Sequence, residues 1–278
     1  MNHASLFSGI GGAEVAASMM GWQNLFHCEI QEFSRKVLDY WFPNSESYGD
    51  ITKTNFQKWR GKVDILTGGF PCQPFSVAGK RQGADDNRYL WPQMLRAIRQ
   101  IQPTWVVGEN VAGIKTLVEP GQEIKMGRTD DLFEENYLYR EEGRFTLEKI
   151  CQDLEAAGYS VQPFNIPACS VGAPHRRERI WIVAHRADAG AQTLQHKRKN
   201  RVLAPGSPPN FQRGNRWEKF PTQSPICGGN DGIPFNVDSL AISFAKWRKE
   251  SIKAYGNAWV PQVAYQIFQA IQAQEEGR

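Results

Sequence analysis

Short apolar runs alternate with amphipathic segments along the first two thirds of the chain, and this alternation restricts the fold more than any other property of the sequence. Runs of β-strand character fall at residues 4–7, 24–30, 63–68, 105–110, 159–166 and 179–185. Segments of helical character follow at 13–20, 32–42, 92–101 and 146–158. This order of strands and helices predicts an α/β fold built on a doubly wound, mostly parallel sheet.

Two stretches interrupt the alternation. Residues 116–145 are polar and charged and are expected to form a surface insertion. Residues 187–235 are rich in glycine, proline, asparagine and arginine and carry no helical pattern, whereas a final helix is predicted over 260–274. We therefore expect a main domain over 1–186, a small irregular lobe over 187–245, and a C-terminal segment over 246–278 that returns to the main domain.

Composition excludes several classes of protein. A chain of 278 residues fits one large domain, or one domain with a smaller lobe. No apolar run is long enough to cross a membrane, and the N-terminus lacks the pattern of a signal peptide. The five cysteines are widely spaced and form no CxxC pair, so neither a zinc site nor a disulfide framework is expected. These properties predict a cytoplasmic protein with no metal and no membrane partner.

Positive charge is concentrated in one part of the chain. The net charge is only +4, but residues 175–219 carry many arginines and lysines and few acids. Such a basic block indicates a polyanionic partner, and the alternative is a solvated surface loop.

A cysteine stands where a sheet of this kind binds its ligands. The stretch GGFPCQPFS, at 68–76, follows the apolar run at 63–68 and carries Cys72 just beyond the predicted strand end. Ligands of open α/β sheets bind beyond the carboxyl ends of the strands. The preceding glycines permit a sharp turn or a close approach to a ligand, and Pro71 stiffens the loop. This position favours a reactive thiol over the alternative of a small buried hydrophobic residue.

Three polar or glycine-rich features follow three successive predicted strands. The turn SLFSGIGG, at 5–12, follows the first strand, Glu29 ends the second, and Asp50 is expected near the end of a third. A glycine-rich turn lets the backbone approach a nucleotide, and an acidic residue at the next strand end can bind ribose hydroxyls. Each feature alone is weak, since a surface carboxylate is common. Together they predict a site for adenosine with no phosphate requirement.

Three charged residues form a further set. Glu109 ends the apolar run at 105–110, where a carboxylate serves either as a helix N-cap or as a catalytic group. Arg177 and Arg179 lead into the run at 179–185 with a spacing that places their side chains on one face of a strand. Such a pair can bind a phosphate or orient a carboxylate, and the alternative is a basic edge strand.

With these motifs in this order, the chain resembles the C5-cytosine DNA methyltransferases. The matching motifs are FSGIGG at 7–12, GGFPCQPFS at 68–76, ENV at 109–111, HRRER at 175–179 and YGNAWVPQ at 255–262. The resemblance covers residues 1–115, 146–185 and 254–270. It implies a class I methyltransferase fold, S-adenosylmethionine as the methyl donor, and methyl transfer to C5 of a cytosine that is flipped out of the duplex.

The resemblance also implies roles for individual residues. Cys72 resembles the nucleophile that adds to C6 of cytosine, and Glu109 resembles the acid at N3, supported by Arg177 and Arg179. The residues that resemble cofactor contacts are Phe7, Gly9, Gly11, Glu29, Asp50, Pro71 and Asn257.

Double-stranded DNA is the partner that the resemblance implies. The stretch from Gln73 to Arg88 resembles the family's mobile loop and supplies Gln73, Ser76, Lys80 and Arg88 as expected DNA contacts. The lobe at 187–245 is expected to recognise the target, with phosphate-binding lysines and base-reading arginines. Those residues are Lys197, Lys199, Arg213 and Arg216. A monomer is expected, and a cognate restriction endonuclease would act separately.

The chain departs from the family pattern at two places. His175 stands where the family has glutamine, and the stretch at 225–238 replaces the arginine-rich motif that usually precedes the Gly-Asn segment. The nearest alternative function is the same chemistry on tRNA, since the PCQ and ENV motifs are shared by such enzymes. A third possibility is a catalytically silent nucleic-acid-binding relative, which the presence of Cys72, Glu109 and Arg177 disfavours.

Overall fold

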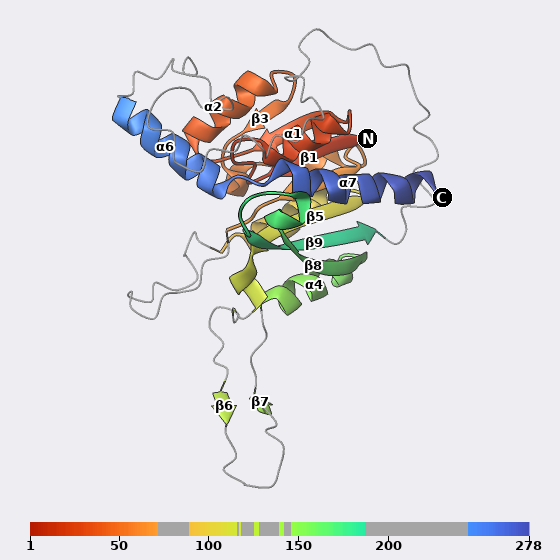
Figure 1. Cartoon of the computed structure of the whole chain (residues 1–278). Coiled ribbons are helices and arrows are strands. Elements are labelled where there is room, and N and C mark those ends of the chain that lie inside the picture. Colours follow the sequence, from red (N-terminus) through yellow and green to blue (C-terminus); the bar gives the residue numbers. More distant parts are fainter. Residues whose placement is uncertain are drawn as a thin grey trace.

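A computed structural model describes residues 1–71, 89–115, 117, 125–127, 139–141, 146–186 and 244–277 (Figure 1). Within these ranges one sheet has the strand order β3-β2-β1-β4-β5-β9-β8. Its strands are β1 (Asn2–Leu6), β2 (Gln23–Cys28), β3 (Glu46–Tyr48), β4 (Ile65–Gly68), β5 (Trp105–Val111), β8 (Tyr159–Pro167) and β9 (Glu178–Arg186).

The sheet is mostly parallel, as the sequence predicts. Strands β1 to β5 pair in parallel, and β9 lies antiparallel between β5 and β8. The chain winds from β1 outward to β3 and then returns to place β4 on the other side of β1. This reversal is a topological switch point, so the loops that follow β1 and β4 diverge and leave a crevice at the carboxyl ends of the strands.

Helices cover both faces of the sheet. They are α1 (Gly12–Met19), α2 (Glu32–Trp41), α3 (Trp91–Ile101), α4 (Thr146–Ala156), α6 (Phe244–Asn257) and α7 (Pro261–Glu276), with short 3₁₀ turns at Ile51–Lys53, Gln57–Trp59, Ala112–Lys115 and Ala168–Val171. On one face α3 and α4 bury Met94, Ile98 and Ile150, and on the other α7 buries Phe268 beside α1. Trp22 stacks on Phe268 with ring centroids 4.9 Å apart. Figure 1 shows α7 crossing the sheet on the side opposite α4.

Helix α6 is not predicted by the sequence pattern. Its buried residues Trp247, Ser251 and Ala254 recur at intervals of four and three residues, and they form one narrow stripe. Trp247 and Ala254 pack with Phe33 and Val37 of α2. The stripe is short and interrupted by charged residues, so only the contact with α2 identifies this segment as a helix with a fixed face.

Several predictions fall wholly or partly outside the described residues. The lobe at 187–245 lies there except for the start of α6, and its role stays a prediction. Within the predicted insertion at 116–145, the strands β6 (Lys125–Gly127) and β7 (Tyr139–Glu141) pair as a separate antiparallel sheet. Among the helices that the structure describes, none has the length and apolar character needed to span a membrane.

Candidate functional site

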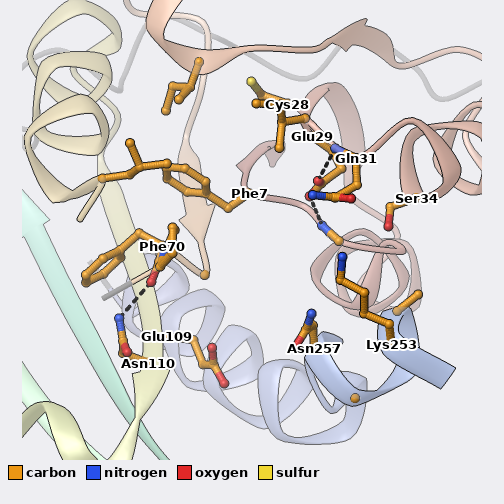
Figure 2. Close-up of a pocket in the computed structure, with 18 of the residues that line it drawn as sticks. Phe7, Cys28, Glu29, Gln31, Ser34, Phe70, Glu109, Asn110, Lys253 and Asn257 are labelled. Carbon is orange, nitrogen blue, oxygen red and sulfur yellow. Dashed lines mark hydrogen bonds between the residues drawn. The ribbon is translucent and has the colours of Figure 1, made fainter. Parts of the chain in front are cut away.

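A cavity of about 570 Å³ lies at the carboxyl ends of the parallel strands (Figure 2). Its walls come from the loops after β1 to β5, from the residues around the start of β9, and from α6. Most of the described residues that the sequence marked as a site line this cavity: Phe7, Gly9, Glu29, Asp50, Pro71, Glu109, Arg177, Arg179 and Asn257. Sequence positions as distant as 7 and 257 therefore share one site.

Glu29 is held rigidly by backbone amides. Its Oε2 accepts a hydrogen bond from the N–H of Gly9 at 2.8 Å, and its Oε1 accepts one from the N–H of Gln31 at 2.7 Å. Arg35 donates to the Glu29 carbonyl at 2.9 Å. Burial raises the pKa of the Glu29 carboxyl, and the two amides oppose that effect. Each oxygen keeps capacity for a second hydrogen bond, so the carboxylate can still accept from a ligand.

The glycine-rich turn contributes open space at Gly9. Phe7 and Gly9 both have positive φ, at 53° and 57°, which turns the chain sharply after β1. A Cβ added at Gly9 would meet no heavy atom within 4 Å, and Gly9 lines the cavity. A ligand can therefore approach the backbone here.

Gly11, the other predicted contact in this turn, does not line the cavity. It is the N-cap of α1 with φ 92°, and a Cβ there would lie 2.8 Å from Cε2 of Phe42. Gly11 is therefore required for the packing of the turn against Phe42 and Leu38.

A third carboxyl lies beneath the same turn. Glu14, on the first turn of α1, is fully buried, and its Oε1 accepts a hydrogen bond from Ser5. Ser5 is also hydrogen-bonded to Ser8, Oγ to Oγ, at 2.5 Å. Glu14 Oε2 has no hydrogen-bond partner within the described residues. Burial raises the pKa of Glu14 to about 7, so the group is largely a neutral acid below that pH.

Asp50 follows β3 and caps the 3₁₀ turn that comes next. Its Oδ1 accepts hydrogen bonds from the N–H of Thr52 at 2.9 Å and from the Thr52 hydroxyl at 2.7 Å. Those bonds lower the pKa of Asp50, so it is a carboxylate at neutral pH. It lines the cavity beside Glu29, which agrees with the expectation that acids at successive strand ends gather at one edge.

Glu109 forms an ion pair at the end of β5. Its Oε1 lies 2.9 Å from Nε of Arg179, and its side chain is 12% exposed. Burial raises the pKa of Glu109, while the charges of Arg179 and Arg177 lower it in part. Next to it, Asn110 donates from Nδ2 to the carbonyl of Phe70 at 2.9 Å. The end of β5 is thereby tied to the chain just before Pro71 (Figure 2).

Arg177 has a different contact from the one predicted. It precedes β9, has a positive φ of 37°, and does not share a strand face with Arg179. Its Nη2 donates to the carbonyls of Gly256 and Ala258, at 2.8 and 2.7 Å. Arg177 thus binds the connection between α6 and α7 to the sheet, and it acts on Glu109 only through its charge.

The position of Trp259 explains why two residues of the motifs are glycine. A Cβ at Gly69 would lie 2.7 Å from its Nε1, and a Cβ at Gly12 would lie 2.8 Å from its carbonyl oxygen. The indole packs edge-on against Trp181 with centroids 4.9 Å apart. The segment after α6 therefore inserts between the loops that follow β1 and β4, and side chains at those glycines would block it.

Several residues of the cavity are not predicted by the sequence motifs. Gln31 and Ser34 at the start of α2, and Glu250 and Lys253 on α6, all line it. The spacing of Glu250, Lys253 and Asn257 repeats at three and four residues, which is a helical signal. That spacing is visible in the sequence. It predicts that the three residues share one face only if the segment is a helix, and it does not by itself show that this face lines a cavity.

Cys28 also lines the cavity, but it is a poor candidate for the nucleophile. Burial raises the pKa of its thiol to about 12, so the thiolate is scarce at neutral pH. Cys72 immediately follows the described Pro71 and lies outside the described residues. The same holds for the predicted DNA contacts, namely Gln73, Ser76, Lys80, Arg88, Lys197, Lys199, Arg213 and Arg216.

Comparison with known proteins identifies the family. The family model of the C-5 cytosine-specific DNA methylase matches residues 1–213. The chain belongs to this family. The match includes all of β1 to β5 and both candidate carboxylates, Glu29 and Glu109.

Curated methylases of the family are similar over most of this chain. Type II methyltransferase M.HpaII of Haemophilus parainfluenzae is 34% identical over 195 residues, which are 69% of this chain and 48% of that protein. M.HhaI of Haemophilus parahaemolyticus is 30% identical, over 68% of this chain and 50% of its own. M.BsuFI of Bacillus subtilis is 31% identical over 87% of this chain and 56% of its own. The chain spans about half the length of the curated relatives it matches.

Solved structures support the fold. A protein described as a DNA modification methyltransferase from an Escherichia coli prophage matches with a TM-score of 0.50 and 24% identity, over 68% of this chain and 48% of its own. A Spodoptera frugiperda DNMT2 variant matches with a TM-score of 0.50 and 21% identity, over 75% of this chain and 57% of its own.

The methylase family implies S-adenosylmethionine as the general methyl donor.

Proposed function

We propose that the chain transfers a methyl group from S-adenosylmethionine to C5 of cytosine in double-stranded DNA, through a covalent bond between Cys72 and C6. The observation that carries this proposal is the Glu109–Arg179 pair beside Pro71. A buried carboxyl paired with a guanidinium lies in the same cavity as the residue that precedes Cys72. An acid and a thiol are two of the groups that methylation at C5 requires.

The described residues fit the methyl donor. Glu29 keeps free acceptor capacity for ribose hydroxyls, Gly9 leaves its backbone open to the cavity, and Asp50 offers a carboxylate next to them. A cavity of about 570 Å³ is within the range of small-molecule sites. When bound, S-adenosylmethionine supplies an electrophilic methyl group on a sulfonium.

The chain's own residues carry the chemistry at cytosine. The Cys72 thiolate forms a bond to C6, and the electron pair of the C5–C6 double bond becomes available at C5 as Glu109 protonates N3. C5 then forms its bond to the methyl group as the bond from methyl to sulfur breaks. Loss of the C5 proton to a base and cleavage of the Cys72–C6 bond, with return of the N3 proton to Glu109, regenerate the enzyme.

Arg179 serves this proton transfer by opposing burial. A buried carboxyl with no cation beside it would keep its proton, and one whose burial was fully offset by a positive charge would lose it. At Glu109 burial raises the pKa, and Arg179, at 2.9 Å, lowers it in part. The cytosine must leave the stacked duplex to reach a cavity at strand ends.

Recognition of DNA is assigned by this proposal to residues beyond those described. Lys197 and Lys199 would bind phosphates, and Arg213 and Arg216 would read base edges. Alanine at either arginine would then relax the recognised sequence at one position, whereas alanine at either lysine would weaken all sites alike. We also propose that the enzyme is monomeric and cytoplasmic, and that a cognate restriction endonuclease acts as a separate protein.

A covalent trap tests the reaction. Duplex DNA containing 5-fluorocytosine should form a stable adduct with the full chain in the presence of S-adenosylmethionine, because fluorine cannot leave C5 as a proton does. Cys72→Ala should form none and should lose methyl transfer while it still binds S-adenosylhomocysteine. Methylation of tRNA but not of duplex DNA would replace this proposal by the tRNA reaction. Retained turnover in Cys72→Ala would remove Cys72 as the nucleophile.

A further inference from the structure

Helix α6 presents a charged face to the cavity. Glu250, Lys253 and Asn257 line the cavity and recur at three and four residues along the helix. The buried side chains Trp247 and Ala254 pack against α2, and Ala254 also lines the cavity. Because that contact sets the rotation of α6, the orientation of its lining residues follows from the fold.

Three cations line the cavity within the described residues, and two of them have protein partners. Arg179 pairs with Glu109, and Arg177 donates to two carbonyls of the segment after α6. Lys253 forms no hydrogen bond or ion pair with another described residue. Among the described cations of the cavity, its ammonium group is therefore the one with no described protein partner, which suits it to an anionic ligand.

Three parts of the fold supply the residues that line the cavity. Glu29 and Asp50 come from the ends of β2 and β3, and Pro71 and Glu109 come from the ends of β4 and β5. Helix α6 supplies Glu250, Lys253 and Asn257. Figure 2 shows Lys253 on the side that carries Gln31 and Ser34, apart from Glu109, with Asn257 nearby.

A sulfonium methyl donor also has three arms. If its adenosine lies by Glu29 and its methyl group by Pro71 and Glu109, its amino-acid arm is directed to the lining residues of α6. We propose that Lys253 and Glu250 bind the zwitterionic end of the donor, Lys253 at the α-carboxylate and Glu250 at the α-ammonium. This inference rests on the proposed use of S-adenosylmethionine and adds two positioning residues for it.

The opposite charges of the two residues favour this ligand over a nucleic acid. A DNA phosphate would be attracted by Lys253 but repelled by Glu250, three residues away on the same lining face. A zwitterion is complementary to both. The carboxylate is also the only anionic group of S-adenosylmethionine, so a cation that faces the bound donor has a single partner to bind.

A comparison of two ligands tests whether Lys253 and Glu250 bind the amino-acid arm. S-adenosylhomocysteine carries the amino-acid arm, whereas 5′-methylthioadenosine has the same nucleoside and thioether without it. By calorimetry with the full chain, Lys253→Ala and Glu250→Gln should each weaken S-adenosylhomocysteine by about tenfold, since a charge-assisted hydrogen bond is lost. Neither change should alter the dissociation constant of 5′-methylthioadenosine.

Lys249→Ala is the matched control. Lys249 is an exposed cation of the same helix that does not line the cavity, so this change should leave both dissociation constants as in the wild type. An equal loss for both ligands in Lys253→Ala, or no loss for either, would overturn the inference. Unchanged S-adenosylhomocysteine binding with a flatter salt dependence of DNA binding would assign Lys253 to a phosphate instead. If the wild type binds neither ligand, the proposed cofactor itself is wrong.

Discussion

Glu29, which is buried, and Glu109, whose side chain is 12% exposed, both lie at the carboxyl ends of parallel strands, and burial raises the pKa of both. Their partners differ. Glu29 accepts hydrogen bonds from two backbone amides, of Gly9 and Gln31. Glu109 instead pairs with the guanidinium of Arg179. The two halves of the sheet thus hold the same chemical group in different settings.

The difference indicates what each carboxyl can do. Backbone amides are donors of fixed position and favour the carboxylate form, so Glu29 suits a constant acceptor for ligand hydroxyls. At Glu109 the charges of Arg179 and Arg177 oppose the effect of burial, and this balance suits a group that gains and loses a proton in the proposed reaction. Location at a strand end is therefore shared, while the donor that faces the carboxyl distinguishes the binding role proposed for Glu29 from the proton transfer proposed for Glu109.

The largest expected effect comes from removing the proton of Glu109. Glu109→Gln keeps the size and a hydrogen-bond donor but cannot protonate N3, so methyl transfer should fall about 10²- to 10⁴-fold. S-adenosylhomocysteine binding, measured by calorimetry, should stay close to that of the wild type. A loss of binding equal to the loss of rate would mean that Glu109 acts on the cofactor and that the comparison with Glu29 fails.

The next effect concerns Glu14, a fully buried carboxyl whose pKa no guanidinium lowers, and for which hydrogen bonds from Ser5, Ser8 and its own backbone amide oppose burial only in part. Its pKa is raised from 4.5 to about 7, so between those pH values the folded state holds a proton that the unfolded state has lost. The free energy of unfolding should therefore fall as pH rises through this window, by about 3 kcal/mol in total from this group.

Glu14→Gln should remove that contribution, because the amide does not titrate. Urea unfolding of both proteins at several pH values between 4.5 and 7.5 measures the difference. His3, whose pKa burial lowers to about 4, titrates in both proteins and cancels. Parallel pH profiles for wild type and variant would show that Glu14 is ionised in the folded state.

A smaller effect is expected at Glu29. Glu29→Ala should weaken S-adenosylmethionine by about 1–3 kcal/mol, because ligand hydroxyls would lose their acceptor and two backbone amides would lose theirs. Calorimetry checks the dissociation constant, and single-turnover methylation at saturating cofactor should change little. An unchanged dissociation constant would place the ribose elsewhere in the cavity.

The smallest effect is expected at His175, which replaces the family's glutamine. It is exposed and does not line the cavity, in contrast to Arg177 and Arg179. His175→Gln should keep the methylation rate at neutral pH within about twofold, as for most surface substitutions. Complete inactivity in a folded variant would assign His175 a chemical task of its own.

Much of the fold and of the site could be predicted because it depends on local order. Each strand of the sheet is marked by an apolar run, except the short β3, and each site residue at a strand end is marked by the loop that follows the run. Parallel strands end at one edge of a sheet, so Phe7, Glu29, Asp50 and Glu109 had to meet there. The family motifs add the identity of the chemistry.

Other features could not be predicted, since they depend on contacts between distant segments. The glycine-rich motif predicts a ligand contact at Gly11, but Phe42, at the end of the next helix, lies against it. Helix α6 could not be predicted because its buried stripe is recognisable only against α2. The same holds for its cavity-lining residues Glu250 and Lys253.

The sequence by itself determined the mostly parallel sheet, the edge at which the candidate site lies, and the residue types available for the proposed methyl transfer, because these follow from the order of strands, turns and motifs. Only the tertiary structure decided which donor faces which carboxyl. Arg177 and Arg179 are two residues apart, yet one binds Gly256, 79 positions away, and the other binds Glu109. Sequence spacing sets which residues are neighbours along a strand, whereas packing of the whole chain decides which groups are close enough to shift one another's pKa.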